Sequence, residues 1–400
     1  MKKLVALALC VTMAFSLSAC GGSSASDNAA STATAGSEAG ETASAAADSE
    51  AASDMKVAMI TDYGDITDQS FNQTTYEECK AWTEANDVEF TYYKPEGDST
   101  ADREAMIDKA YADGYNVFVL PGYAFAEAIT NSADMYPDAM YVALDVSQAD
   151  LDSASGEDGY TRDNVYCAVY QEEISGYMAG VAAVKMGYKK LGFLGGMAVP
   201  AVMRFGYGFV QGADAAAAEL GLSDVEVNYA YGNQFSGDAD ITAAMDTWYQ
   251  GGTEVVFACG GGIWTSAAEA AAKVDGKVIG VDVDQKATID GKYGDGITIT
   301  SAMKGLKATV DTLLDAIKAG EWDQYKGQIQ NLGLVSGDDV EANYVELPLE
   351  STVWNDTFTV DDYKELVKNL FDGTVTVSSD VSAEEPTAST AKVNFQGNIK

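Results

Sequence analysis

The chain has 400 residues, a formal net charge of −38 and no histidine. A balance this acidic repels phosphate backbones and anionic lipid surfaces, so we do not expect nucleic acid as a partner. The absence of histidine excludes Ser-His-Asp triads, Cys-His dyads, HExxH zinc sites and histidine general bases, and we expect neither a metal nor a cofactor.

Residues 1–20 predict an exported lipoprotein. A basic start is followed by an apolar run at residues 5–15, which is too short for a permanent membrane helix and is typical of a signal-peptide core. The run leads into Leu17-Ser18-Ala19-Cys20, which resembles a bacterial lipobox whose cysteine is lipidated. The alternative is an ordinary signal peptide that happens to contain a cysteine. We expect Cys20 to anchor the protein to the outer face of the cell membrane.

The next segment, residues 21–54, is almost entirely Gly, Ser, Ala, Thr and acidic residues, without Lys, Arg or aromatic residues. Such a stretch cannot bury enough apolar surface to offset its chain entropy, so it predicts a disordered tether. Further along, Cys167 and Cys259 lie in apolar, strand-like runs. They therefore predict buried thiols rather than metal or redox sites.

From residue 55 onward, short β-rich apolar runs alternate with longer helical stretches. The first series has strands at 56–61, 88–93, 117–120 and 140–144, with helices at 71–86, 100–113 and 123–135. The second has strands at 190–194, 225–231, 254–258, 277–281 and 297–301, with helices at 171–186, 202–220 and 302–319. Each series predicts a doubly wound, mostly parallel α/β sheet.

Roughly 345 residues follow the tether, which is too many for one such core and suits two. We expect a first lobe at 55–165 with a return segment at about 299–330. The second lobe is expected at 166–298 with about 331–377. A C-terminal extension at 378–400 carries a possible strand at 392–395. Two doubly wound lobes in one exported chain predict a type I periplasmic-binding-protein fold, with a ligand beyond the carboxyl ends of the strands.

The loop after the first strand carries the most informative motif. Thr61-Asp62 ends the strand, and Gly64 to Gln73 follows with an aromatic residue and two further carboxylates. Ser70 and Gln73 fit a capping box, which accounts for only part of the pattern. The segment resembles the G-x-x-x-D-x-S-F-N-Q signature of the basic-membrane-protein, or PnrA-like, family of nucleoside-binding lipoproteins.

Five further segments resemble the same family, in the same order along the chain. They are Ala143-Leu144-Asp145, Tyr231-Gly232-Asn233-Gln234-Phe235 with Asp238, Gly260-Gly261-Gly262, Ile279 to Gln285, and Thr300 to Lys304. The resemblance implies a monomeric substrate-binding protein that captures a nucleoside, with purines favoured, and passes it to an ABC permease. It implies no catalytic residues.

The resemblance also implies roles for nine residues in a cleft between the lobes. Phe71 and Phe235 would stack on the two faces of a base. Phe205 is the alternative for the second face, and the alternative for any one of these rings is a place in the hydrophobic core. Asp62, Asp68 and Asn72 would meet ring nitrogens and amines. Asp282 and Lys304 would hold ribose hydroxyls, and Asp145 suits either end of the ligand. Gly261 would let the backbone approach the sugar.

Two departures from the family pattern leave the ligand open. Trp264 is bulkier than the pattern suggests, and Gly232-Asn233-Gln234-Phe235 replaces a more usual Gly-Ser-Phe. A receptor of the same fold for riboflavin, a monosaccharide or a signalling furanose is the first alternative. A glycosidic hydrolase using the carboxylates of Asp65 and Asp68 is the second. The glycine run lacks the Gly-Lys-Ser/Thr of a nucleotide P-loop.

Overall fold

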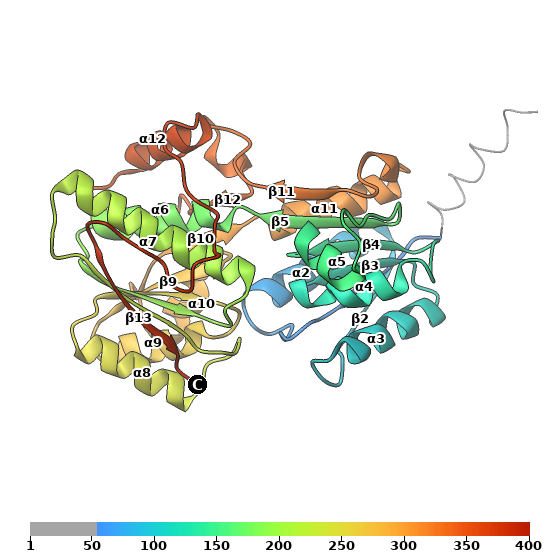
Figure 1. Cartoon of the computed structure of the whole chain (residues 1–400), viewed down its shortest axis with the longest axis horizontal. Helices are drawn as coiled ribbons and strands as arrows, with labels where there is room; N and C mark the ends of the chain where they lie inside the picture. Colours follow the sequence, from blue (N-terminus) through green and yellow to red (C-terminus); the bar gives the residue numbers. More distant parts are fainter. Residues whose placement is uncertain (1–53) are drawn as a thin grey trace, which may run out of the picture. The chain divides into compact units, whose positions relative to one another are not determined.

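The computed structural model describes residues 54–400 (Figure 1). The expected signal peptide, Cys20 and nearly all of the tether lie outside the described residues. Within residues 54–400, none of the helices combines the length and the apolar composition that crossing a membrane requires.

The first sheet has six strands, all parallel, in the order β11-β5-β4-β3-β1-β2. They are β1 (Lys56–Ile60), β2 (Glu89–Tyr93), β3 (Val117–Pro121), β4 (Met140–Leu144), β5 (Val165–Tyr170) and β11 (Ile329–Leu332). One face packs against α3 (Thr100–Ala112), α4 (Ala126–Ser132) and α5 (Gln148–Ser155). The other packs against α2 (Phe71–Asn86) and α11 (Leu306–Lys318). We call this sheet with its helices the first lobe.

The second sheet has seven strands in the order β12-β10-β9-β8-β6-β7-β13, and only β12 is antiparallel to its neighbour among the described strands. The strands are β6 (Lys190–Gly195), β7 (Glu226–Tyr231), β8 (Val255–Cys259), β9 (Lys277–Asp282), β10 (Thr298–Lys304), β12 (Val345–Glu346) and β13 (Lys392–Asn398). Its helices are α6 (Glu172–Lys185), α7 (Pro200–Leu220), α8 (Ala239–Gln250), α9 (Trp264–Ala272), α10 (Lys286–Tyr293) and α12 (Val360–Phe371). This sheet and these helices form the second lobe.

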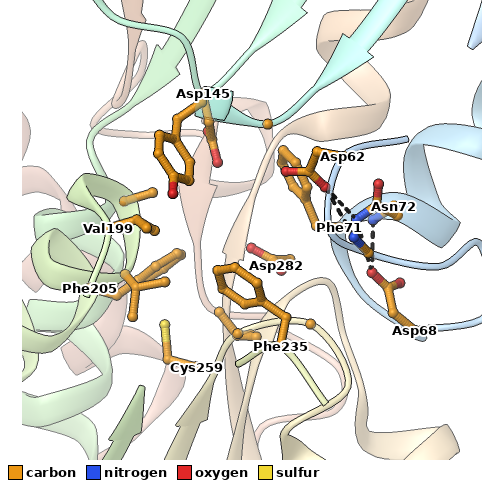
Figure 2. Close-up of a pocket in the computed structure, with 18 of the residues that line it drawn as sticks. Asp62, Asp68, Phe71, Asn72, Asp145, Val199, Phe205, Phe235, Cys259 and Asp282 are labelled. Atoms are coloured by element: carbon orange, nitrogen blue, oxygen red, sulfur yellow. Dashed lines mark hydrogen bonds between the residues drawn. The ribbon is translucent and has the colours of Figure 1, made fainter. Parts of the chain in front are cut away.

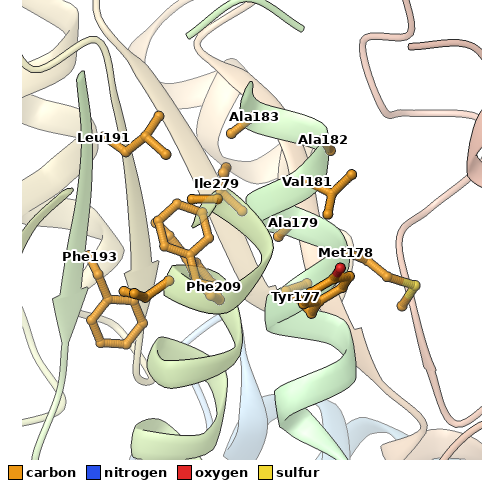
Figure 3. Close-up of a cluster of buried hydrophobic side chains, with 14 of the residues drawn as sticks. Tyr177, Met178, Ala179, Val181, Ala182, Ala183, Leu191, Phe193, Phe209 and Ile279 are labelled. Carbon is orange, nitrogen blue, oxygen red and sulfur yellow. The ribbon is translucent and has the colours of Figure 1, made fainter. Parts of the chain in front are cut away.

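Glycines bring α6 and α7 unusually close together over the second sheet. A Cβ at Gly176 would lie 2.1 Å from the carbonyl oxygen of Phe205, and one at Gly212 would lie 2.1 Å from that of Tyr177. Neither position therefore accommodates a side chain without backbone movement. Figure 3 shows the resulting core, where side chains of α6, Phe209 of α7 and strand β6 meet.

Two features, at β10 and β13, differ from the sequence-based expectations on lobe boundaries, whereas β11 lies at the end of the expected return segment. Strand β10 pairs with β9 and β12 in the second sheet, so the segment that returns to the first lobe begins at α11 rather than at residue 299. Strand β11 pairs with β5 in the first sheet. Strand β13, in the C-terminal extension, pairs with β7 at an edge of the second sheet. The hydrophobic pattern of β10 does not show to which sheet the strand belongs, because β10 is almost wholly buried and its sequence would be equally apolar in either sheet.

Cys167 and Cys259 are buried and free, as their apolar surroundings predict, and Cys79 is also buried and free. The chain changes sheet after β5, after β10 and after β11. The carboxyl ends of β5 and β10 therefore carry Glu172 and Lys304 to the points where the two lobes are connected.

Candidate functional site

One pocket gathers the residues that follow the strands of both sheets (Figure 2). All nine side chains or backbone positions expected at a ligand line it, together with Phe205. The nine come from the ends of β1, β4, β7, β8, β9 and β10 and from the start of α2, and Phe205 comes from α7. With its mouth included, the pocket measures about 680 Å³, within the range of small-molecule sites. This placement follows the rule that parallel sheets bind ligands at their carboxyl edges.

Further lining residues were not anticipated from the sequence. They are Gly64, Gly122, Tyr123, Val199, Pro200, Ala201, Val202, Cys259, Gly260 and Val281. Gly122 and Tyr123 directly follow β3, so the strand-end rule identifies them once β3 is placed. The Val199–Val202 segment begins α7 and carries no polar side chain to mark it.

Lys304 is the charged centre of the pocket and is only 5% exposed. Its Nζ lies 2.6 Å from Asp145 Oδ2, 3.5 Å from Glu172 Oε1 and 3.8 Å from Asp282 Oδ1. The same Nζ lies 4.5 Å from the centroid of the Phe71 ring, within cation–π range. Burial alone would lower the pKa of Lys304, but the three carboxylates raise it, so the ammonium stays charged. Lys304 is thus a cation enclosed by carboxylates and not a solvent-exposed side chain.

Glu172 contacts Lys304 and is itself paired with Arg204, and no sequence motif indicated either residue. Glu172 is fully buried. Its Oε2 accepts a hydrogen bond from Arg204 Nε at 2.6 Å, while its Oε1 faces Lys304. Lys304 lies on β10 and Arg204 on α7, so only the folded chain brings both cations to the Glu172 carboxylate. A buried carboxylate requires such partners.

The start of α2 is held by Asp68 rather than by Ser70. The Asp68 carboxylate accepts hydrogen bonds from the backbone N–H groups of Ser70, Asn72 and Gln73 at 2.9–3.0 Å. Ser70 makes no side-chain cap, and its hydroxyl instead donates to Asp282 Oδ2 at 2.5 Å. The expected capping box is therefore wrong, because the Ser70 hydroxyl is taken by a carboxylate from the other lobe.

Asp62 and Asn72 form a polar corner beside Asp68 (Figure 2). Asp62 Oδ1 accepts from Gly64 N at 3.2 Å and from Asn72 Nδ2 at 3.4 Å. Asn72 Oδ1 is buried without a partner among the described residues. Burial raises the pKa of Asp62 and of Asp68 to about 6. The carbonyl oxygen of Asn72, unpaired within residues 54–400, and the two carboxylates can therefore accept hydrogen bonds from N–H groups of a ligand.

The aromatic rings of the pocket differ in how far they are free to contact a ligand. Phe71 and Phe235 are half-buried. Phe205 is 2% exposed and packs edge-on against Phe257, with ring centroids 5.9 Å apart. The ring centroid of Tyr63, from the first lobe, lies 6.3 Å from that of Phe235. Phe205 thus lines the pocket as part of the core, and Phe235 has the freer ring.

Asp145 and Asp282 occupy equivalent positions at the ends of β4 and β9. Both have left-handed backbones, with φ of 63° and 66°. Aspartate and asparagine tolerate this conformation better than alanine does. Non-glycine residues held in this region concentrate at functional sites. Asparagine is therefore the appropriate replacement at either position.

The buried carboxylates predict an unusual dependence of stability on pH. The pKa values of Asp62, Asp68 and Asp145 rise to about 6 and that of Glu173 to about 7, in each case chiefly through burial. These groups bind protons more tightly when folded than when unfolded, so they favour the folded state increasingly as the pH falls through 7 toward 5. No histidine opposes this trend. We expect a higher melting temperature at pH 5.5 than at pH 8.

The control for this dependence is Asp62→Asn, which should reduce the difference between the two melting temperatures. Carboxylates with lowered pKa, such as Asp214, oppose the trend only near pH 4 and below. A melting temperature that falls steadily from pH 8 to pH 5.5 would contradict the assignment of buried, destabilised charges.

Sequence comparisons identify the family. The Bmp family, described as "ABC transporter substrate-binding protein PnrA-like", matches residues 55–365. The ABC transporter nucleoside-binding protein BmpA of Lactococcus lactis subsp. cremoris is 29% identical over 345 residues, 82% of this chain and 90% of that protein. Basic membrane protein B of Borreliella burgdorferi is 27% identical over 258 residues, 63% of this chain and 70% of that protein.

Solved structures agree on the fold. The solute-binding protein of an ABC transporter system from Aeropyrum pernix K1 superposes with a TM-score of 0.62 at 22% identity, covering 80% of this chain and 87% of that one. Its counterpart from Conexibacter woesei gives a TM-score of 0.60 at 22% identity, covering 81% and 99%. The predicted two-lobed type I periplasmic-binding fold is confirmed. The chain therefore belongs to the Bmp family of PnrA-like substrate-binding proteins of ABC transporters.

Proposed function

We propose that this protein captures nucleosides, purines in preference, in the pocket between its lobes and delivers them to an ABC permease. One observation carries the proposal. A single pocket combines two half-buried phenylalanine rings, a corner of hydrogen-bond acceptors and a buried lysine–carboxylate cluster. The nucleoside-binding name of the L. lactis relative supports it.

The two parts of the pocket suit the two parts of a nucleoside. The rings of Phe71 and Phe235 stack on the base, at about 1–3 kcal/mol for one aromatic contact, and a purine offers them more surface than a pyrimidine. Asp62 and Asn72 accept its N–H groups. At the other end, Asp282 accepts from ribose hydroxyls and Lys304 donates to them, while Asp145 holds the ammonium in place.

The charge of the pocket predicts discrimination against nucleotides. Four lining carboxylates, Asp62, Asp68, Asp145 and Asp282, face one lining cation, Lys304, which is already shared among carboxylates. A phosphate group would meet several like charges in a desolvated site, at a cost of several kcal/mol. We expect adenosine 5′-monophosphate to bind at least about 100-fold more weakly than adenosine in calorimetric titrations.

The matched control is 5′-O-methyladenosine, which adds bulk at the same atom without charge. If it is excluded as strongly as the monophosphate, the 5′ position is limited by space rather than by charge. Equal affinity for adenosine and its monophosphate would contradict the proposed polarity of the pocket.

Attachment to the membrane through Cys20 belongs to the same proposal. Several relatives in archaea are named lipoproteins, among them one from Pyrococcus furiosus at 26% identity. Cys20→Ala should release the protein from the membrane fraction, and continued retention there would refute the anchor. We further propose that the protein acts as a monomer and leaves its ligand chemically intact. Chromatography of incubated nucleosides would reveal free base if the carboxylates acted as a hydrolase.

A further inference from the structure

Three side chains of the second lobe contact Asp68 and Gln69 of the first lobe beside the pocket, two through main-chain carbonyl oxygens and one through a side-chain oxygen. Trp264 Nε1 donates to the carbonyl oxygen of Asp68 at 3.2 Å. Gln285 Nε2 donates to the carbonyl oxygen of Gln69 at 2.8 Å, and Thr288 Oγ1 donates to Gln69 Oε1 at 3.2 Å. We call these three contacts the latch. Trp264, which departs from the family pattern, supplies one of its three donors.

The orientation of Gln285 is fixed before it reaches the other lobe. Its side chain is 1% exposed. Its Oε1 accepts from Val281 N at 2.9 Å, and its own backbone N–H donates to Ser301 Oγ at 3.1 Å. With the oxygen committed to Val281, the amide nitrogen has to point toward Gln69. A preorganised donor of this kind loses little conformational entropy when the contact forms.

Trp264 is equally constrained. Its side chain is 3% exposed, and its ring packs edge-on against Tyr293 with centroids 6.3 Å apart. The indole N–H therefore has one partner, the Asp68 carbonyl, and it would otherwise be a buried donor without an acceptor. Opening the lobes would expose this donor and the acceptor to water.

The acceptor side of the latch is strained. Gln69 has a left-handed backbone with φ of 57°. Its N–H donates to Gln73 Oε1 at 3.0 Å, and its side-chain Nε2 donates to the same oxygen at 2.5 Å. A non-glycine residue stays in this conformation only where its surroundings impose it. Gln69 directly precedes Ser70 and Phe71, so its conformation sets where Asp68 and Phe71 meet the pocket.

We propose that Trp264, Gln285 and Thr288 are positioning residues, which keep the lobes closed and thereby set how long a nucleoside stays bound. None of the three lines the pocket. They act through the main chain of Asp68 and through both the main chain and the side chain of Gln69. Closure is favoured by these contacts in addition to those of the ligand. The kinetic part of this inference rests on the proposed function, whereas the closure itself is independent of it.

The kinetic test compares Trp264→Phe, Thr288→Val and the double variant with the wild-type protein. Each substitution removes one donor. Thr288→Val keeps the shape of the side chain, and Trp264→Phe keeps an aromatic ring of smaller size. We expect each to raise the dissociation rate of inosine or guanosine about 2- to 13-fold in stopped-flow experiments, and the double variant to combine the two effects. Association rates should change little.

The matched control is Trp248→Phe, which also removes an indole N–H contact, here to Gln396 Oε1 within the second lobe. It should leave nucleoside dissociation at the wild-type rate. If the double variant releases nucleosides at the wild-type rate, or if Trp248→Phe accelerates release equally, the latch is overturned.

Small-angle scattering of ligand-free protein provides the arm that does not depend on nucleosides. The double latch variant should have a larger radius of gyration than the wild type, whereas Trp248→Phe should not. If the wild-type protein binds no nucleoside, the proposed function fails, and the scattering measurement alone then tests the latch. An identical radius for the double variant and the wild type would then refute the latch.

Discussion

Replacing Lys304 by methionine should destabilise the protein by about 3–5 kcal/mol, because it removes the cation from a buried cluster and leaves its carboxylates in place. Asp145, Glu172 and Asp282 all face the ammonium, and Glu172 is fully buried. Methionine keeps the length and apolar contacts of the lysine stem, so the loss measures charge rather than packing. Urea unfolding at pH 8 gives the free energy directly.

The control is Lys307→Met, at the start of α11. Lys307 is exposed, and its Nζ lies 3.7 Å from Oε2 of the partly buried Glu78. Such pairs contribute about 0–1 kcal/mol. The destabilisation at Lys304 should also shrink at pH 5, because Asp145, whose pKa burial raises to about 6, can then become neutral. Equal effects of the two substitutions would contradict the buried cluster.

Removing the Phe71 ring should weaken nucleoside binding about 5- to 150-fold, the equivalent of one aromatic–base stack. The ring is half-buried, and Lys304 Nζ lies 4.5 Å from its centroid, so in the proposed complex the same ring would contact both the base and the cation. In Phe71→Ala, ribonucleosides and deoxyribonucleosides that share a base should lose affinity to a similar degree. Calorimetry on a variant with an unchanged circular-dichroism spectrum provides the measurement.

Asp282→Asn is the counterpart that separates the two ends of the ligand. Asparagine tolerates φ of 66° and still accepts from Ser70, but it carries no charge. Because charged acceptors form hydrogen bonds about twice as strong as neutral ones, this variant should weaken ribonucleosides more than analogues lacking the hydroxyl it meets. A uniform loss for all ligands, free bases included, would assign Asp282 to lobe structure instead.

Local pattern was sufficient to predict the two sheets and the strand-end residues. A parallel strand shows its apolar run and its terminal polar residue in the sequence itself, as at Asp62, Asp145 and Asp282. The lobe to which β10 belongs could not be predicted in this way, because a strand buried on both faces has the same pattern in either sheet.

The remaining parts of the site depend on contacts between distant segments. The hydroxyl of Ser70 was expected to cap its own helix, but it donates to Asp282, 212 positions away. Glu172 faces Lys304 across 132 positions, and Trp264 reaches Asp68 across 196. No local rule selects one buried partner among many at such separations. Residues that hold other residues in place were therefore missed, whereas all nine residues expected at a ligand do line the pocket.

The most direct test of the central claim is a calorimetric titration of protein that has been unfolded, dialysed and refolded to remove any bound ligand. Inosine, guanosine, adenosine, uridine and cytidine should be compared with riboflavin and a panel of monosaccharides. We expect at least one nucleoside, a purine most tightly, to bind at one site, and Phe71→Ala to weaken it. Saturation by riboflavin or a monosaccharide, with no heat from any nucleoside, would contradict the account.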